Sequence, residues 1–347
     1  MSLNENADLD PSQVEDLRGA GGGGGGGGGG MFPGLGGGGG GGGGLPGGGG
    51  AALGCLGSLL PMFLKGGKGG KLGLVLILVI CCVGGFCLLR GGGLNSLGDL
   101  GGLGGGTAPQ ASANNSALAV TCSKDNPKRF DDPACRNLAY INSIQAYWQK
   151  SLPQNFGKPY QVVPTRYFSG SVNTACGAAT SGVGPFYCPG DNRVYIDLSF
   201  YDELARRFGA PGQFAQAYVL AHEYGHHVQT LLGTEAEVRR AQQRDPRNAN
   251  RYSVAMELQA DCYAGVWAKS ATSTTSDTGV PFFTNITTKD LDEALNAAAA
   301  VGDDTIQKKA GGSINEDGFT HGSAAQRQQW FRQGYTTGDP KQCNTFS

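Results

Sequence analysis

The chain has 347 residues, 62 of them glycine, and a formal net charge of −1. It carries no basic stripe, zinc-finger spacing or arginine-rich tract, so nucleic acid is not an expected partner. The composition changes abruptly near residue 107, and the length alone would therefore give a wrong domain count.

Glycine runs dominate the N-terminal part of the chain. Glycine has no side chain to bury and loses the most backbone entropy on ordering, so we expect residues 1–70 to be a disordered cytoplasmic arm. The runs are Gly21–Gly30, Gly36–Gly44 and Gly47–Gly50.

An uncharged run of 18 residues, Leu72–Leu89, follows this arm. It has about the minimum length for a helix that spans a bilayer, so we expect a transmembrane helix over residues 71–90. A buried core helix is the alternative, but it would show a polar stripe, which this run lacks. A cleaved signal peptide would instead start at the N-terminus.

The charges around this run predict its orientation. Three lysines precede the run and one arginine follows it closely: Lys65, Lys68, Lys71 and Arg90. The positive-inside rule therefore places the N-terminus in the cytoplasm. Residues 91–118 are rich in small and polar residues and are expected to be a linker. The single domain over residues 119–347 would then lie outside the cell membrane.

Six cysteines lie in that domain: Cys122, Cys135, Cys176, Cys188, Cys262 and Cys343. An even number fits disulfides in an oxidising compartment, and the alternative is six reduced, buried thiols. Short loops favour pairing Cys122 with Cys135 and Cys176 with Cys188, which leaves Cys262 with Cys343. A structural zinc site is disfavoured because the domain has no C-x-x-C pair.

The first half of the domain predicts one helix and two strands. Asn137–Leu152 places its apolar residues on one helical face. Gln161–Ser169 and Arg193–Phe200 are rich in β-branched and aromatic residues and are predicted to be strands. The glycine-rich stretch Gly177–Gly190 between them is predicted to be a loop tied by its cysteines.

The second half predicts four helices, and the order of elements indicates an α+β fold, mainly helical with a small sheet. The first helix, Gln213–Leu232, is followed by Gly233 as a C-terminal stop. Ser323 and Gln326 form a capping-box pair at the start of the last helix, which is predicted to stop at Gly334. The two helices between them are predicted over Ser253–Lys269 and Asp290–Val301.

The sequence His222-Glu223-Tyr224-Gly225-His226 has the pattern H-E-x-x-H within the first of these helices. Two imidazoles one turn apart on one helical face can share a metal ion. Glu223 would lie beside the metal, where it can take a proton from a bound water.

A catalytic zinc site needs a third protein ligand and an open position. The metzincin pattern fails, because Gln229 and Leu232 stand where it requires glycine and histidine. Glu257 is the predicted third ligand, and Asp261, which shares its helical face, is the predicted partner of a ligand imidazole. The rivals Glu235 and Glu237 follow the helix-ending glycine too closely to fold back easily.

Two further histidines lie near the motif or near the last helix. His227 is rotated about 100° from the metal face, so we expect it to pack or form a hydrogen bond. His321 precedes the last helix, where a loop could bring it to the cleft to stabilise an oxyanion. The alternative is a structural histidine whose hydrogen bonds are satisfied at the start of the last helix.

Four segments together resemble the bacterial family called putative neutral zinc metallopeptidases: AYVLAHEYGHHVQTLLG, ELQADCYAGVWA, GPFYCPGDNRVYIDLSF and FTHGSAAQRQQWF. The similarity covers most of residues 120–347 and many members carry an N-terminal membrane anchor. It implies a zincin-like fold, Zn²⁺ bound by His222, His226 and Glu257, and Glu223 as the base. In zincins an edge strand pairs with the peptide substrate, and Arg193–Phe200 is the candidate for that strand.

The sequence therefore predicts a membrane-anchored zinc metallopeptidase, a hydrolase that acts on peptide or protein substrates. One alternative is a zinc-binding envelope scaffold without peptidase activity, although such a site has no need of Glu223. The other alternative is a zinc hydrolase of non-peptide amides or esters.

Overall fold

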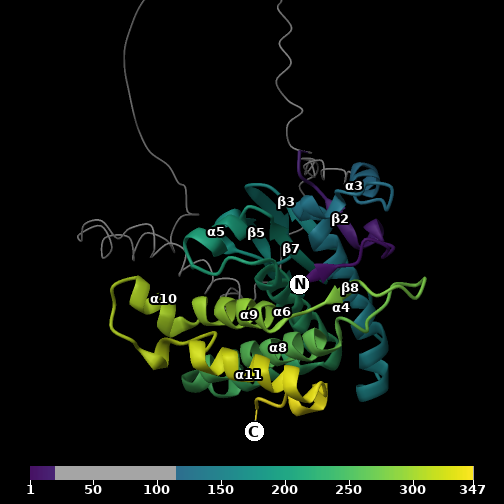
Figure 1. Ribbon diagram of the computed structural model, residues 1–347. Helices are drawn as coiled ribbons and strands as arrows, with labels where there is room; N and C mark the ends of the chain where they lie inside the picture. The colour runs from purple at the N-terminus through teal and green to yellow at the C-terminus, as the bar shows by residue number, and fades with distance from the viewer. Residues whose placement is uncertain (20–114, 347) are drawn as a thin grey trace, which may run out of the picture.

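The computed structural model of the protein describes residues 1–19 and 115–346. They form an α+β fold that is mainly helical, as the sequence predicts (Figure 1). The helices are α3 (Asn115–Thr121), α4 (Pro133–Phe156), α5 (Phe200–Arg206), α6 (Gln213–Leu232), α7 (Thr234–Arg244), α8 (Ala249–Ser270), α9 (Thr288–Ala300), α10 (Asp303–Lys309) and α11 (Ala324–Thr337). The strands are β1 (Ser2–Leu3), β2 (Val14–Asp16), β3 (Thr165–Phe168), β4 (Ser171–Thr174), β5 (Gly177–Thr180), β6 (Phe186–Cys188), β7 (Arg193–Asp197) and β8 (Phe283–Asn285).

The helix ends follow the local signals in the sequence. Helix α6 has the predicted bounds and ends at Gly233, whose φ of 84° suits a residue without a side chain. Helix α11 begins with the predicted capping box, in which Ser323 and Gln326 each bond the other's backbone. Helix α8 begins four residues before its predicted start at Ser253, because a 3-10 turn leads directly into it.

The predicted end of α11 at Gly334 is wrong, since the helix continues to Thr337 and ends at Gly338. Gly334 instead allows α11 to lie against α8. A Cβ atom at Gly334 would come within 2.0 Å of the Cys262 carbonyl oxygen, and one at Gly265 within 2.1 Å of the Phe331 carbonyl oxygen. The two glycines therefore mark a close helix crossing.

The main sheet has the strand order β2-β3-β7-β6, with β6 antiparallel to β7 and the other pairs parallel. Figure 1 shows this sheet above α6, with α8, α9 and α11 below it. Strand β7 ends at Asp197, and Phe200 already begins α5.

Two predictions about this region are wrong. The stretch Gly177–Gly190 is more than a loop, because it contains β5 and β6. Strand β7 is also not an edge strand, since β3 and β6 flank it on both sides. The edges of the main sheet are β2 and β6, and each has only three residues, too few to give a periodic signal.

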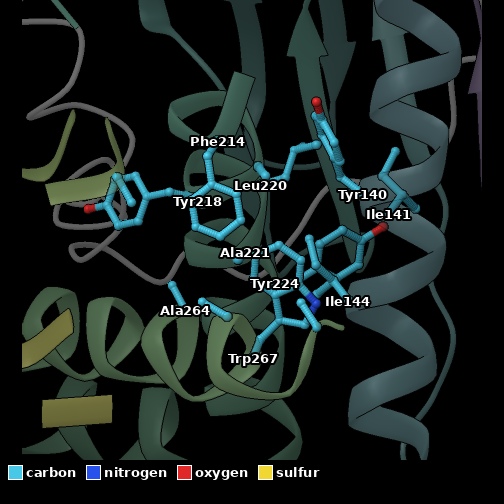
Figure 2. Packing of buried hydrophobic residues seen from close by; sticks show 14 of the residues in the cluster. Tyr140, Ile141, Ile144, Phe214, Tyr218, Leu220, Ala221, Tyr224, Ala264 and Trp267 are labelled. Atoms are coloured by element: carbon cyan, nitrogen blue, oxygen red, sulfur yellow. The ribbon is translucent and has the colours of Figure 1, made fainter. Parts of the chain in front are cut away.

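The core lies where α4, α6 and α8 meet (Figure 2). Aromatic rings fill much of it: Trp267 stacks on Phe214 at a centroid distance of 6.0 Å, and Trp148 meets Tyr263 edge-on at 5.3 Å. Apolar side chains of α4 such as Ile141 and Ile144 close the other side. This core holds α6 and α8 in a fixed relation.

The described part of the chain contains three disulfides: Cys122–Cys135 and Cys176–Cys188, which the short loops favour, and Cys262–Cys343, the pair that these two leave. The second ties β6 to the β4–β5 hairpin, and the third ties the C-terminal segment to α8.

Residues 1–19 are part of the folded domain, so the prediction of a disordered arm over residues 1–70 is wrong for them. The remainder of that predicted arm lies outside the described residues. Strand β1 pairs with β8, and β2 adds a parallel strand to β3. Val14 is fully buried in the main core. In Figure 1 this purple segment runs beside β8 and α3. Strands β1 and β2 have only two and three residues, which are too few to show an alternating pattern in the sequence. Their partner strands also lie far away in the chain.

The domain also begins before residue 119, because α3 starts at Asn115 within the predicted linker. Within residues 1–19 and 115–346, none of the helices combines the length and the apolar character needed to cross a bilayer. The predicted span over residues 71–90 lies outside the described residues.

Candidate metal centre

Helices α6 and α8 bring the three predicted ligands together. The Nε2 atom of His222 lies 3.1 Å from one carboxylate oxygen of Glu257, and the Nε2 atom of His226 lies 3.6 Å from the other. One ligand atom from each residue lies within 4.8 Å of the other two. Gly225 makes this approach possible, because a Cβ atom there would lie only 3.0 Å from Ala260 Cα on α8.

Asp261 orients the first histidine. Its Oδ1 atom lies 2.8 Å from His222 Nδ1 and accepts a hydrogen bond of 2.5 Å from the Tyr218 hydroxyl. The guanidinium of Arg327 donates to both of its oxygens, at 2.8 and 3.0 Å. With Asp261 bound to Nδ1, the Nε2 atom of His222 is left to face a metal ion.

The second histidine is oriented through a chain of glutamines. His226 Nδ1 lies 2.9 Å from Gln229 Oε1. The amide group of Gln229 donates to Gln259 Oε1 at 3.1 Å, and that of Gln259 donates to the Cys343 carbonyl at 3.0 Å. Because Cys343 is disulfide-bonded to α8, this chain connects the C-terminal segment to a ligand imidazole.

Glu223 lies beside the ligands and is held by the sheet edge. One of its oxygens accepts a hydrogen bond of 2.9 Å from the backbone N–H of Tyr187 on β6. Its side chain is close enough to His222, His226 and Glu257 that their charges affect its pKa. The base candidate therefore lies between the three candidate ligands and strand β6.

Burial and charge shift the pKa values in opposite directions here. Burial raises the pKa of Glu223 above its ordinary value. Burial opposes a charge on His222, but the carboxylates of Asp261 and Glu257 raise its pKa to about 10. Burial would also raise the pKa of Glu257, but His226, His321 and His222 outweigh it and hold the pKa below its ordinary value.

His321 lies at the same site, near Glu257. Burial would lower its pKa, but the charges of Glu257 and Asp303 raise it. Asp303 Oδ1 lies 3.3 Å from His321 Nδ1, and Oδ2 accepts from the backbone N–H groups of Thr320, His321 and Gly322. Asp303 thus fixes the loop that carries the imidazole, and both the oxyanion role and a histidine satisfied at a helix start fit these contacts.

The other candidates lie elsewhere. His227 is buried, with Nδ1 at 3.1 Å from the Tyr187 hydroxyl and Nε2 at 2.7 Å from the Gln161 carbonyl oxygen, as expected for a packing residue. Glu235 bonds to Thr230 at 2.8 Å and pairs with Arg239 on α7. Glu237 lines a cavity of about 550 Å³ beside α7 that none of the predicted ligands lines. We do not assign this cavity to the metal centre.

The residues present fit a zinc ion. Two imidazoles and one carboxylate form a known ligand set of catalytic zinc, and both Nδ1 atoms are already engaged by polar partners. The side chain of His226 retains 17% of its exposure, so the three candidate ligands are not fully enclosed by protein.

Four side chains that support the site are not among the residues predicted from the sequence: Tyr218, Gln229, Gln259 and Arg327. Tyr218 precedes His222 by one helical turn and Gln229 follows His226 by three residues, so helical spacing could have indicated both. Arg327 comes from a different helix, and no local pattern connects it to Asp261.

The similarity of this chain to known proteins agrees with a metal-binding site. The sequence profile of the family described as Putative neutral zinc metallopeptidase matches residues 6–346. The uncharacterized protein YpfJ of Escherichia coli (strain K12) is 42% identical over 278 residues, which are 80% of this chain and 87% of YpfJ. The uncharacterized Mycobacterium proteins Mb2605 (M. bovis) and Rv2575 (M. tuberculosis H37Rv) are each 52% identical over 215 residues, which are 61% of this chain and 70% of each relative.

No solved structure matched the chain. The family profile begins at residue 6, so it includes most of the N-terminal segment that packs on the domain. From this match, together with the convergence of His222, His226 and Glu257, the chain belongs to the Putative neutral zinc metallopeptidase family.

Proposed function

We propose that this protein is a zinc-dependent peptidase in which His222, His226 and Glu257 hold the metal and Glu223 is the general base. The observation that carries the proposal is the convergence of the three ligand atoms beside a buried carboxylate at a sheet edge. A zinc ion in such a site lowers the pKa of a bound water and polarises a carbonyl group.

Glu223 is suited to move the proton. Its carboxylate is buried beside the three candidate ligands, where a general base would take a proton from a metal-bound water. The backbone N–H of Tyr187 holds the Glu223 carboxylate in place. The protonated Glu223 carboxyl group would then give its proton to the leaving nitrogen of the peptide.

Strand β6 is suited to bind the substrate. The Tyr187 N–H points to Glu223 and away from β7, and among the described residues no strand pairs with that side of β6. An extended peptide that pairs with this edge by main-chain hydrogen bonds would present a carbonyl group to the metal centre. We assign the substrate strand to β6 in place of the earlier candidate Arg193–Phe200.

His321 would donate a hydrogen bond to the carbonyl oxygen on which negative charge develops, and Asp303 would keep the imidazole in that orientation. Replacing His321 by Gln should lower kcat by roughly 10²-fold, as for other oxyanion donors, and leave the zinc content unchanged.

The test measures zinc content and cleavage of a mixed peptide library with the full-length chain and its Glu223→Gln variant. The full chain is needed because residues 1–19 are part of the fold. We expect one zinc in both proteins and cleavage only in the unaltered chain, since the glutamine cannot accept the proton.

An active Glu223→Gln protein would disprove the role of the base. Zinc in both proteins with cleavage in neither would favour the envelope scaffold or a non-peptide substrate. Loss of zinc in a His222→Ala variant checks the ligand set separately from activity.

We also propose that the domain acts in an oxidising compartment outside the cytoplasm. Three disulfides, which are rare in cytoplasmic proteins, support this location.

A further inference from the structure

Tyr187 contacts helix α6 at two points that are one helical turn apart. Its backbone N–H donates to a carboxylate oxygen of Glu223 at 2.9 Å, and its side-chain hydroxyl lies 3.1 Å from His227 Nδ1. Glu223 and His227 are four residues apart in α6, so their side chains share one face of the helix. One residue of β6 therefore spans the turn of α6 that carries the candidate base.

The Tyr187 hydroxyl donates its hydrogen to His227. The Nε2 atom of His227 lies 2.7 Å from the Gln161 carbonyl oxygen, which can only accept, so Nε2 carries the hydrogen of the ring. Burial lowers the pKa of His227 to about 4, and the neutral imidazole therefore has Nδ1 as an acceptor at pH 7. Burial also raises the pKa of Tyr187 to about 12, so the phenol keeps the hydrogen that it donates.

The contact with His227 fixes the Tyr187 side chain to the helix. The hydroxyl also lies 2.9 Å from the Asn192 side-chain oxygen, but Asn192 belongs to the turn between β6 and β7 and connects it only to the sheet. His227 is fully buried, and its ring packs against the rings of Tyr160 and Tyr187 at centroid distances of 5.3 and 5.4 Å. The imidazole is therefore a fixed partner for the hydroxyl.

Strand β6 is short and lies at an edge of the main sheet. It has three residues, and among the described strands only β7 pairs with it. Because N–H groups alternate in an antiparallel pair, those of Phe186 and Cys188 face β7, while that of Tyr187 faces away, toward Glu223. The pairing with β7 therefore does not bind the Tyr187 N–H itself.

We propose that Tyr187 and His227 are positioning residues: the hydrogen bond between their side chains holds the Tyr187 N–H, and through it the Glu223 carboxylate, in the orientation that proton transfer needs. A small misplacement of a reacting group can lower the rate strongly, so a hydroxyl that does not touch the substrate can still affect turnover. The effect on turnover rests on the proposed peptidase function, whereas the coupling between the Tyr187 hydroxyl and the Glu223 contact does not.

The first test compares kcat, KM and zinc content of the full-length chain and its Tyr187→Phe variant. The phenylalanine keeps the ring and the backbone N–H and removes only the hydroxyl. We expect a kcat that is about 5–10-fold lower, the size expected for one neutral hydrogen bond, with KM and zinc content unchanged. Tyr160→Phe is the matched control, because that ring packs on His227 while its hydroxyl bonds to Gln145 at 3.3 Å.

The second test replaces His227 by two different amides. Asparagine places its side-chain oxygen near the position of Nδ1 and keeps an acceptor for the Tyr187 hydroxyl, whereas glutamine reaches the position of Nε2 and keeps the donor to Gln161. We expect a smaller loss of kcat in His227→Asn than in His227→Gln. Adding Tyr187→Phe to His227→Gln should cause little further loss, because both changes remove the same contact. Equal losses in the two amide variants, or the opposite order, would overturn the proposal.

The third test needs no substrate. Hydrogen exchange of the amide at residue 187, measured by NMR in the same proteins, reports how firmly Glu223 holds this N–H. We expect exchange at residue 187 to be about 5–10-fold faster in Tyr187→Phe and in His227→Gln. The amides of Phe186 and Cys188, which face β7, should be unchanged in these variants, and Tyr160→Phe should leave all three amides unchanged.

Unchanged exchange at residue 187 in Tyr187→Phe would contradict the proposal. Faster exchange at all three amides would also contradict it, since the variant would then have lost the strand pairing and not only a position. If exchange rises at residue 187 alone but the unaltered chain cleaves no peptide, the positioning of Glu223 holds and the proposed peptidase function fails instead.

Discussion

Asp261 is the residue that connects the metal ligands to the rest of the domain. It is fully buried, and its charge is balanced by Arg327, which is also buried. Burial would raise the pKa of Asp261, but Arg327 and His222 outweigh it and lower the pKa below its ordinary value. The carboxylate therefore stays ionised and can accept a hydrogen bond from His222 Nδ1.

Replacing Arg327 by Met should leave that carboxylate buried without its cation. We expect a loss of about 3–5 kcal/mol in the free energy of unfolding and a 10–100-fold weaker zinc affinity, measured by denaturant titration and by competition with a chelator. Arg332→Met, at an exposed position of the same helix, is the matched control. Unchanged zinc affinity in the Arg327 variant would show that Asp261 does not act on His222.

Asp197 should make the free energy of unfolding depend on pH. Burial alone would raise its pKa, but hydrogen bonds from Ser181, Gly170 and Ser199 lower it below the ordinary value. Because the folded-state pKa is the lower one, the carboxylate stabilises the fold at neutral pH, and this contribution is lost as the pH falls through the folded value.

An Asp197→Asn variant should therefore be less stable than the unaltered chain at pH 7, and the difference should shrink below about pH 4. Urea titrations at a series of pH values measure it, with Asp202→Asn, at an exposed position on α5, as the control. A constant difference down to pH 3 would contradict the assignment.

At the scale of elements, the close crossing of α8 and α11 decides whether the site forms. Asp261 and Arg327 belong to these two helices, and the crossing glycines lie one or two turns further along each of them. Helix packing at this distance excludes any side chain at the crossing.

Gly334→Ala should destabilise the fold by about 1–3 kcal/mol through overpacking and should weaken zinc binding, because the helices must separate. The free energy of unfolding and the zinc affinity are measured together. Gly312→Ala is the control, since the nearest atom to a Cβ there is 3.6 Å away and the backbone is not left-handed. Equal stability of the two variants would argue against the crossing.

At the scale of the whole molecule, residues 1–19 complete both the sheet and the charge balance. Deleting residues 2–18 should expose the β3 edge, remove the Glu5 and Ala7 carbonyl groups from Arg129, and remove the Glu15 carboxylate from Arg166 and Arg193. We expect a lower Tm in thermal unfolding of the full-length background, whereas Asn6→Ala at an exposed position should change it little. An unchanged Tm after the deletion would mean that the segment does not contribute to the fold.

The sequence by itself predicted the features that a few neighbouring residues encode. The bounds of α6, the capping box at Ser323 and the two short-loop disulfides follow from local signals, and the H-E-x-x-H spacing predicts two imidazoles on one face. The third ligand could be named because Glu257 and Asp261 share a face of the next long helix.

Only the tertiary structure decided which distant pieces meet. Strand β2 pairs with β3 across some 150 positions, β6 and not β7 lies at an edge of the sheet, and Arg327 reaches Asp261 from another helix. The sequence predicts that α11 ends at Gly334, but this glycine instead allows the close contact with α8. A glycine gives the same local signal in both cases, and only its neighbours in the fold distinguish them. Such pairings depend on packing between remote segments, and that packing leaves no periodic pattern in the local sequence.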